Sequence, residues 1–285
     1  MDRRSDESCV AFLQWALPRI GLRWAGFRKV RRQVCRRVAR RVGELGLQDL
    51  DAYRAHLLAH PEEWDVLRAL TPVTISRFAR DQAVFRALGE TVLPMLAAAA
   101  RAEGRDQLRA WSAACASGEE AYTLALLWDD VAPAGDMRFE VLATDVHPPV
   151  LARARAARYE LSSMRELPED LRSRGFDAGA GGTLVVRARY RRAVTVARHD
   201  LRDGPPAGPF DLVLCRNAAF TYFGPDDRRA VLGRLSAALR PGGALVVGLH
   251  EALPAPAPDF EAWPCARAVH RYVPARCSDA EEVSP

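Results

Sequence analysis

Two stretches of the chain combine residue types that can bind a polar ligand. Phe139–Asp145 is an apolar run that ends in a carboxylate. An acid at the end of a buried strand commonly accepts hydrogen bonds from the hydroxyls of an adenosine ribose. Trp111–Trp128 starts apolar, passes through small residues and continues into an amphipathic pattern. We therefore expect a strand, a tight turn and a helix, where Ala113 and its small neighbours let a ligand approach the backbone.

Two acids, Glu119 and Glu120, occupy the first turn of that expected helix. One of them has the ordinary role of complementing the positive end of the helix dipole. The other carboxylate is well placed for a cationic ligand group such as an amino-acid ammonium. Two acids would repel a pyrophosphate, and the stretch lacks the G-x-G-x-x-G form of a dinucleotide site.

A third motif is Cys215-Arg216-Asn217, which ends another apolar run and leads to Thr221-Tyr222-Phe223. Pro241-Gly242-Gly243 precedes a late apolar run. Such a turn is frequent in methyltransferases with a doubly wound sheet. Together with Asp145, these features suit S-adenosylmethionine as a ligand better than NAD.

These motifs need a scaffold, and the chain from about residue 105 predicts one. Apolar runs alternate with helical patterns, which indicates a doubly wound, largely parallel sheet. Strands are expected at 139–145, 211–215, 244–248 and 270–273, and helices at 150–159 and 226–239. Residues 176–198 suggest one or two extra strands in a small β excursion. Ligands bind such sheets outside the carboxyl ends of the strands.

The N-terminal part, residues 8 to about 85, predicts three or four short helices. The strongest runs from about Phe27 to Leu45 and ends at Gly46, with an apolar face at helical spacing. Its other face carries Arg28, Arg32, Arg36 and Arg40, with Arg31, Arg37 and Arg41 beside them. This arginine stripe is either a solvated face or a surface for an acidic partner, protein or nucleic acid. No aromatic residues interrupt it, so stacking on single-stranded bases is not indicated.

Composition limits the alternatives. The chain has 285 residues, of which 49% are hydrophobic, and its net charge is +5. Its basic residues are almost wholly arginine. We expect a cytoplasmic protein, because no signal peptide or apolar run of transmembrane length is evident. The cysteines are scattered without a C-x-x-C pair, which argues against a zinc ribbon and against a disulfide framework; they are Cys9, Cys35, Cys115, Cys215, Cys265 and Cys277. No metal site is expected.

With these motifs in place, the chain resembles the CheR family of S-adenosylmethionine-dependent protein-glutamate methyltransferases over roughly residues 10 to 255. The resemblance rests on Arg80-Asp81, the Trp-Ser-Ala…Ser-Gly-Glu-Glu…Tyr-Thr motif, Ala143-Thr144-Asp145 and Phe210-Asp211…Cys215-Arg216-Asn217…Tyr222-Phe223. It implies an N-terminal all-α domain, a Rossmann-like doubly wound methyltransferase sheet and a small β-subdomain.

The resemblance also implies roles for single residues. Glu120, with Glu119 as the alternative, should contact the cofactor's amino group, and Asp145 its ribose. Asp200 and Leu201 should border the adenine, and Asn217 should line the cofactor pocket. Arg80 and Tyr222 match the catalytic arginine and tyrosine beside the transferred methyl. Alternatively, Arg80 forms a salt bridge, for instance to Asp81, that holds the linker against the catalytic domain.

The chain differs from the family pattern at four points. Ala114 stands where the family usually has glycine, and Ala79 replaces one of two aromatic residues before the arginine. One extra residue separates Asn217 from Tyr222. The late Gly-His-Ser-Glu motif is Gly248-Leu249-His250-Glu251, in which we expect His250 to be a supporting hydrogen-bonding residue.

The expected function is methyl-ester formation on a carboxylate, most plausibly a glutamate of an acidic protein segment; a nucleic-acid partner and membrane insertion are not expected. The alternatives are methylation of a small molecule or RNA, or a non-catalytic module that binds S-adenosylmethionine or S-adenosylhomocysteine. The predicted domains are a helical domain over 1–85, a methyltransferase domain over 86–276 and a tail over 277–285.

Overall fold

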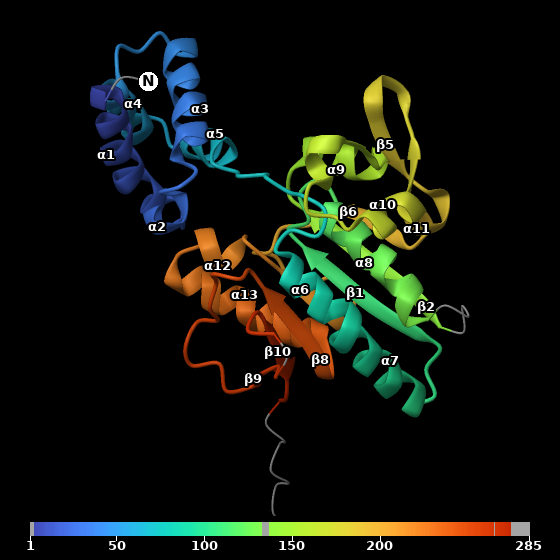
Figure 1. Cartoon of the computed structure of the whole chain (residues 1–285). Coiled ribbons are helices and arrows are strands. Elements are labelled where there is room, and N and C mark those ends of the chain that lie inside the picture. Colours follow the sequence, from blue (N-terminus) through green and yellow to red (C-terminus); the bar gives the residue numbers. More distant parts are fainter. Residues whose placement is uncertain (1–2, 133–136, 265, 275–285) are drawn as a thin grey trace, which may run out of the picture. The chain divides into compact units, whose positions relative to one another are not determined.

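The computed structural model describes residues 3–132, 137–264 and 266–274, which form two compact units (Figure 1). A helical unit extends to Ile75 and also includes Thr221–Arg228. A second unit, which we call the sheet unit, comprises Ser76–Phe220 and the described residues from Arg229 onward. The tail predicted from residue 277 lies outside the described residues.

The helical unit is built from five helices around an apolar core. Phe12, Leu13, Val34, Val38 and Tyr53 are among its fully buried side chains. Helix Leu50–Ala59 begins at a capping residue, because the Asp49 carboxylate accepts the Ala52 N–H at 2.8 Å. The helices are α1 (Arg3–Arg19), α2 (Trp24–Phe27), α3 (Arg31–Glu44), α4 (Leu50–Ala59) and α5 (Glu63–Leu70).

The segment Thr221–Arg228 joins this unit through backbone hydrogen bonds. The Arg23 N–H donates to the Tyr222 carbonyl at 2.8 Å, and Gly224 N–H to the Gly21 carbonyl at 2.9 Å. The approach is so close that a Cβ on Gly26 would lie 2.3 Å from the Thr221 carbonyl oxygen. Glycine is therefore required at position 26.

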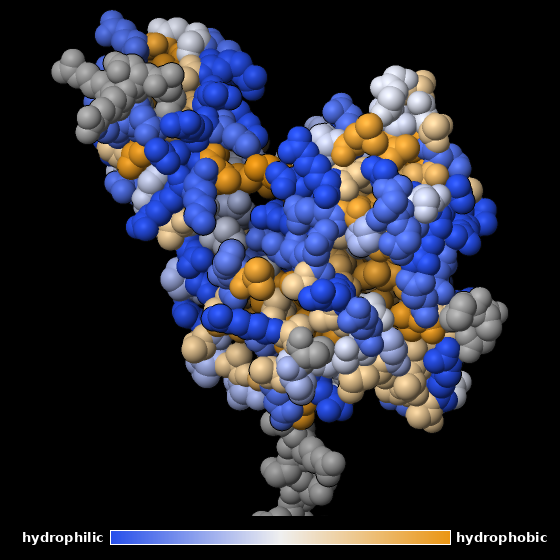
Figure 2. Space-filling model, in the orientation of Figure 1, coloured by the Kyte–Doolittle hydropathy of each residue, from blue (hydrophilic) through white to orange (hydrophobic). Residues whose placement is uncertain are grey.

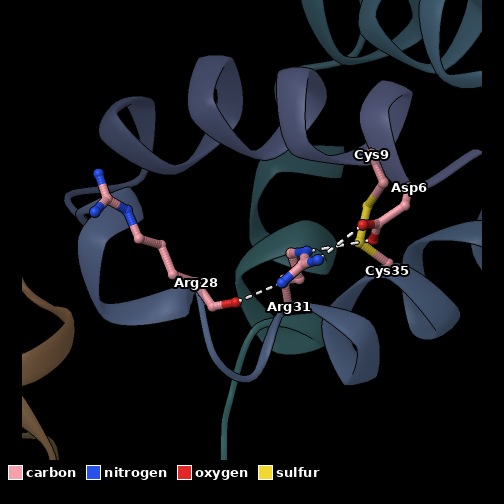
Figure 3. Close-up of a disulfide and its surroundings, with 5 residues drawn as sticks. All are labelled: Asp6, Cys9, Arg28, Arg31 and Cys35. Carbon is pink, nitrogen blue, oxygen red and sulfur yellow. Dashed lines mark hydrogen bonds and ion pairs between the residues drawn. A yellow bond between two sulfur atoms is a disulfide. The ribbon is translucent and has the colours of Figure 1, made fainter. Parts of the chain in front are cut away.

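The helical unit contains a disulfide between Cys9 of α1 and Cys35 of α3 (Figure 3). Our expectation that the scattered cysteines form no disulfide framework was wrong for this pair. The two residues are separated by 26 positions in sequence but face each other across the packed helices. Beside the sulfur atoms, Arg31 pairs with Asp6 at 2.8 Å and joins the same two helices. Cys115 and Cys215 are buried free thiols.

The sheet unit has a seven-stranded sheet of order β6-β2-β1-β7-β8-β10-β9. Its first five strands pair in parallel, and β10 and β9 are antiparallel. β1 and β7 lie at the centre, and their apolar side chains are almost wholly buried. The strands are β1 (Gln107–Ala113), β2 (Arg138–Asp145), β6 (Val194–Arg198), β7 (Phe210–Cys215), β8 (Leu239–Val247), β9 (Phe260–Ala262) and β10 (Val269–Tyr272).

The remaining helices alternate with the strands from β1 onward, and the residues of the last two, α12 and α13, are divided between the two units. They are α6 (Gln82–Ala87), η1 (Leu88–Val92), α7 (Leu93–Ala102), α8 (Glu119–Val131), α9 (Pro148–Ala156), η2 (Leu161–Met164), α10 (Glu169–Gly175), η3 (Ala180–Gly182), α11 (Ala188–Arg192), α12 (Ala219–Tyr222) and α13 (Pro225–Ala238). The continuous helical stretch Gln82–Ala102 has the length and composition of a membrane span. In the fold its residues Val84, Leu88, Val92 and Leu96 are buried in the core of the sheet unit.

The small β excursion exists, but its composition differs from the expectation. Its three strands have the order β3-β5-β4 and are β3 (Arg158–Glu160), β4 (Phe176–Ala178) and β5 (Thr183–Val186). Residues 158 and 159, expected as the end of a helix, belong to β3 because α9 ends where Ala157 turns left-handed, at φ 48°. Residues 194–198, expected in the excursion, pair with β2 in the main sheet.

The structure thus confirms the predicted fold class. It has a doubly wound, mostly parallel sheet, a small antiparallel sheet and an all-helical N-terminal unit.

Candidate functional site

The turn after β1 brings small residues and backbone N–H groups to the carboxyl edge of the sheet. Ala113 is the last residue of β1 and is buried. The next residues alternate through left-handed backbone, with φ of 63° at Ala114, 48° at Ala116 and 89° at Gly118. A Cβ on Gly118 would lie 3.0 Å from the Ala154 Cβ, so glycine permits the close packing of α8 against α9.

Asp145 ends β2 next to this turn. Its Oδ2 accepts the Ala116 N–H at 3.0 Å, and its Oδ1 accepts the His147 N–H at 3.0 Å and lies 2.9 Å from the His147 Nδ1. A carboxylate offers about four lone-pair positions. One position on Oδ2 is therefore available for an incoming hydroxyl, and the residue fits the ribose role predicted for it.

The two acids of α8 have different surroundings. Glu119 is buried, its Oε1 accepts the Ser117 hydroxyl, and its Oε2 has no hydrogen-bond partner in the described chain. Glu120 accepts the Ser112 hydroxyl at 2.7 Å and the Arg216 guanidinium at 3.2 Å. Each Glu120 oxygen retains an acceptor position, and Ser112 lies near the end of β1. The surroundings favour Glu120 as the acid that meets an ammonium group.

Arg216 lies among these residues, although in the sequence it stood out only as part of the Cys215-Arg216-Asn217 motif. Its side chain is 3% exposed, and it lies at the end of β7. It donates to Glu120, to the Asp81 carboxylate at 2.8 Å and to the Arg80 carbonyl at 2.8 Å. Two nearby acids make burial of this cation tolerable. Arg216 thereby joins the Arg80-Asp81 segment to the first turn of α8.

Arg80 is held in place by its backbone neighbours. Ala79 and Asp81 are left-handed on either side of it, with φ of 50° and 64°. The Ala79 N–H donates to the Thr123 hydroxyl at 3.1 Å, and the Asp81 N–H to the Glu166 carboxylate at 3.0 Å. The Arg80 guanidinium lies 3.5 Å from the Asn217 Oδ1. The Asp81 carboxylate, proposed above as a partner of Arg80, pairs with Arg216.

Asn217 follows Arg216 and is also left-handed, with φ 53°. Its N–H donates to the Glu251 Oε2 at 2.7 Å. Asp200 and Leu201 follow β6, where the neighbouring His199 N–H donates to the Asp145 carbonyl at 3.1 Å. Leu201 is buried, and the Asp200 carboxylate accepts the Arg202 N–H at 2.9 Å. The carboxyl edge therefore brings together Ala113, Glu120, Asp145, Asp200, Leu201, Asn217 and Arg80.

Tyr222 belongs to the helical unit and is described within it. Its ring packs on Phe27 with 4.9 Å between the ring centroids. His250, expected to support the site by hydrogen bonding, is exposed to solvent. Its neighbour Glu251 provides hydrogen-bond acceptors at this edge of the sheet instead.

Strained backbone marks the site. The described residues include six non-glycine positions with positive φ, and five of them are Ala79, Asp81, Ala114, Ala116 and Asn217. Such conformations persist where surrounding contacts fix them, and they concentrate at functional sites. The left-handed backbone at Ala114 could have been predicted from the sequence, because the family usually has glycine at this position.

The buried thiols are poor candidates for nucleophiles. Burial, reinforced by the Asp145 and Glu120 carboxylates, raises the pKa of Cys115 well above its ordinary value. Burial likewise raises the pKa of Cys215. Both thiols stay protonated at neutral pH, and a neutral thiol is a weak nucleophile.

Comparison with known families gives two matches. The family of the CheR methyltransferase SAM binding domain matches residues 74–269, and the family of the CheR methyltransferase all-alpha domain matches residues 29–70. The first match contains all the site residues described above, from Arg80 to Glu251.

Curated relatives agree with these matches. A chemotaxis protein methyltransferase of Listeria monocytogenes is 35% identical over 193 residues, covering 68% of this chain and 71% of the relative. The Escherichia coli chemotaxis protein methyltransferase is 31% identical over 228 residues, covering 78% and 76%. An uncharacterised 104.1 kDa protein of Rhodobacter capsulatus is 36% identical over 80% of this chain, which matches only 24% of that protein.

Among solved structures, a glycopeptide N-methyltransferase complexed with S-adenosyl-L-homocysteine is 18% identical with a TM-score of 0.36, covering 65% of this chain and 59% of the other.

Proposed function

This chain belongs to the CheR family of S-adenosylmethionine-dependent methyltransferases, and from that premise we propose that it forms a methyl ester on a glutamate side chain of a protein. The observation that carries the proposal is the placement of Arg80. Its backbone is fixed by Thr123, Glu166 and Arg216, at the same edge of the sheet as Glu120 and Asp145.

Methyl transfer to a carboxylate depends on the positioning of the reactants more than on proton transfer. S-adenosylmethionine supplies an electrophilic methyl group on a sulfonium. A glutamate carboxylate is already ionised at neutral pH, so the attacking oxygen needs no general base. It needs alignment with the methyl carbon and the departing sulfur. The Arg80 guanidinium can orient the substrate carboxylate through paired hydrogen bonds.

The proposed cofactor contacts follow from the acceptors at the sheet edge. Asp145 holds the ribose hydroxyls, and Glu120 meets the ammonium of the methionine part. Asp200 and Leu201 border the adenine after β6, and Asn217 lines the pocket beside Arg80. Ala113 and the small residues after it allow the cofactor to approach the backbone. In this proposal Tyr222 acts beside the transferred methyl.

The proposed acceptor is an acidic protein segment, and the support comes from α3. Arg28, just before α3, and Arg32 and Arg36 within it are exposed, as is Arg40, which pairs with Glu44 at 3.5 Å. Arg31, Arg37 and Arg41 are half-buried and bonded to Asp6, to the Leu70 and Pro72 carbonyls, and to Glu63, respectively. In Figure 2 hydrophilic residues cover the helical unit where Figure 1 draws α3. The positive charge of Arg28, Arg32 and Arg36 can attract anionic side chains.

We also propose the cytoplasm as the location and the boundaries 1–85 and 86–276 for the two domains. Burial of the apolar positions of Gln82–Ala102 in the core supports a role for that stretch inside the fold.

The test is methyl transfer from radiolabelled S-adenosylmethionine to an acidic helical peptide. A matched control peptide carries glutamine in place of the glutamate that is expected to be methylated. We expect label on the glutamate peptide only, released as methanol in mild alkali, because an ester is alkali-labile. Alkali-stable label, or label on RNA instead of the peptide, would contradict the ester proposal. Cofactor binding without transfer to any acceptor would identify a non-catalytic binding module.

A further inference from the structure

Glu251 lies where two central strands leave the sheet, and its carboxylate connects them. Its Oε2 accepts the Asn217 N–H at 2.7 Å, just after β7, and the Gly248 N–H at 2.6 Å, just after β8. The Glu251 N–H closes the turn by donating to the Gly248 carbonyl at 2.8 Å. One carboxylate oxygen therefore fixes the exits of two neighbouring parallel strands.

The site around this carboxylate is closely packed. Gly248 is buried, and a Cβ at that position would lie 2.7 Å from the Glu251 Oε2 and 3.0 Å from the Asn217 Oδ1. The absence of a side chain at position 248 is therefore what lets the carboxylate approach both N–H groups.

The bond matters because Asn217 has a left-handed backbone, which asparagine adopts more readily than most residues but which is still uncommon outside glycine. Its φ of 53° lies in the left-handed region, which usually needs external contacts to persist. A hydrogen bond from a backbone N–H to a carboxylate is among the stronger kinds. Once this backbone is fixed, the Asn217 side chain lies with its Oδ1 3.5 Å from the Arg80 guanidinium.

We propose that Glu251 is a positioning residue for the cofactor site: its carboxylate fixes the left-handed turn at Asn217 and thereby sets the Asn217 amide beside Arg80. The inference rests on the proposed function, because it assigns Glu251 to the same site. Glu251 touches neither cofactor nor substrate in this account. It acts through the backbone of Asn217.

The experiment compares four variants by calorimetric titration with S-adenosylhomocysteine and by steady-state methyl transfer. Glu251→Ala removes the acceptor, and Gly248→Ala displaces it while keeping the carboxylate in the chain. Glu251→Gln retains an acceptor oxygen of similar reach. Glu261→Ala, an exposed glutamate of β9, is the matched control. Circular dichroism checks that each variant is folded.

We expect Glu251→Ala and Gly248→Ala to weaken S-adenosylhomocysteine binding at least about tenfold, because two N–H groups lose their acceptor. Glu251→Gln should stay within about threefold of the parent, since an amide oxygen still accepts. Glu261→Ala should bind as the parent does. Parental affinity in a folded Glu251→Ala or Gly248→Ala protein overturns the inference, as does a Glu251→Gln protein as weak as Glu251→Ala.

Amide hydrogen exchange separates this inference from the function on which it rests. The Asn217 and Gly248 amides should lose protection in Glu251→Ala without any ligand. If the parent binds no S-adenosylhomocysteine, the proposed function fails, whatever the variants do. If the parent binds and Glu251→Ala leaves both protection and affinity unchanged, only the role of Glu251 fails.

Discussion

The carboxylate of Asp145 accepts the backbone N–H of Ala116 at 3.0 Å, so the acid that ends β2 also shapes the turn that follows β1. These strands are neighbours in the sheet, and their register sets Ala113 opposite Thr144. This side chain holds the small-residue turn, and in the proposed function it also accepts a ribose hydroxyl.

Arg80→Ala separates binding from turnover. Arg80 is assigned to the substrate carboxylate, so the variant should bind S-adenosylhomocysteine within about threefold of the parent while kcat falls at least about a hundredfold, the usual cost of lost orientation. Calorimetry and methyl-transfer kinetics measure the two effects. Arg101→Ala, a change in the last turn of α7, is the control. An Arg80→Ala enzyme with parental kcat would exclude the assigned role.

Ala114→Gly tests the backbone strain in the first turn. Ala114 has φ 63°, a region that costs an alanine about 1–2 kcal/mol, whereas glycine adopts it freely. Glycine also adds conformational entropy to the unfolded chain, which offsets part of this gain. The variant should therefore be more stable than the parent by about 0.5–1 kcal/mol. Urea unfolding at unchanged m-value measures the difference. The matched change Ala99→Gly, in the regular helix α7, should instead destabilise by about 1 kcal/mol. A destabilised Ala114→Gly protein would argue against strain there.

The disulfide should stabilise the helical unit. Cys9 and Cys35 close a loop with a sequence separation of 26 residues, for which loop entropy predicts about 3.5 kcal/mol. A thiol reductant should therefore shift the urea midpoint of the helical unit to lower concentration. The Cys9→Ser/Cys35→Ser double variant should already have the lower midpoint and should not respond to the reductant. A parent protein with no response would show that the bond adds nothing.

Glu63 should make the helical unit sensitive to acid. Its buried carboxylate pairs with Arg41 at 2.8 Å and accepts the Tyr53 hydroxyl at 2.8 Å. Hydrogen bonds from Arg41, the largest cause, hold the pKa of Glu63 below its ordinary value of 4.5. A depressed pKa stabilises the fold above pH 4.5, and this contribution is lost as the pH falls through the folded-state value.

Thermal unfolding of Glu63→Gln between neutral and acid pH measures that contribution. The variant should be less stable than the parent at neutral pH and should approach it as the pH falls. Glu62→Gln, whose side chain is 75% exposed, should follow the parent curve. Parallel curves for Glu63→Gln and the parent would rule out the carboxylate as the cause.

Much of the fold was predictable because it depends on local pattern. The apolar run ending at Asp145 and the alternation that follows residue 105 are visible in sequence. The disulfide was not, since the pairing of Cys9 with Cys35 depends on how α1 packs on α3. The end of α9 at Ala157 was also missed, because the left-handed residue there is not a glycine.

The site likewise combines features that were predictable from local sequence with contacts that were not. Acids at strand ends were visible as motifs, and the structure brings Asp145, Glu120 and Asn217 to one edge. The contacts that fix them come from residues distant in sequence. Arg216 reaches Glu120 and Asp81, and Glu251 reaches Asn217. Such partners follow from strand order and turn geometry, which periodicity does not reveal.

The most direct test of the account is calorimetric titration of the parent and of Asp145→Ala with S-adenosylhomocysteine. Asp106→Ala, an exposed acid just before β1, is the matched control. We expect binding by the parent and by Asp106→Ala, and none by a folded Asp145→Ala protein. Equal binding by the parent and Asp145→Ala would contradict the ribose assignment, and a folded parent that binds nothing would contradict the cofactor site itself.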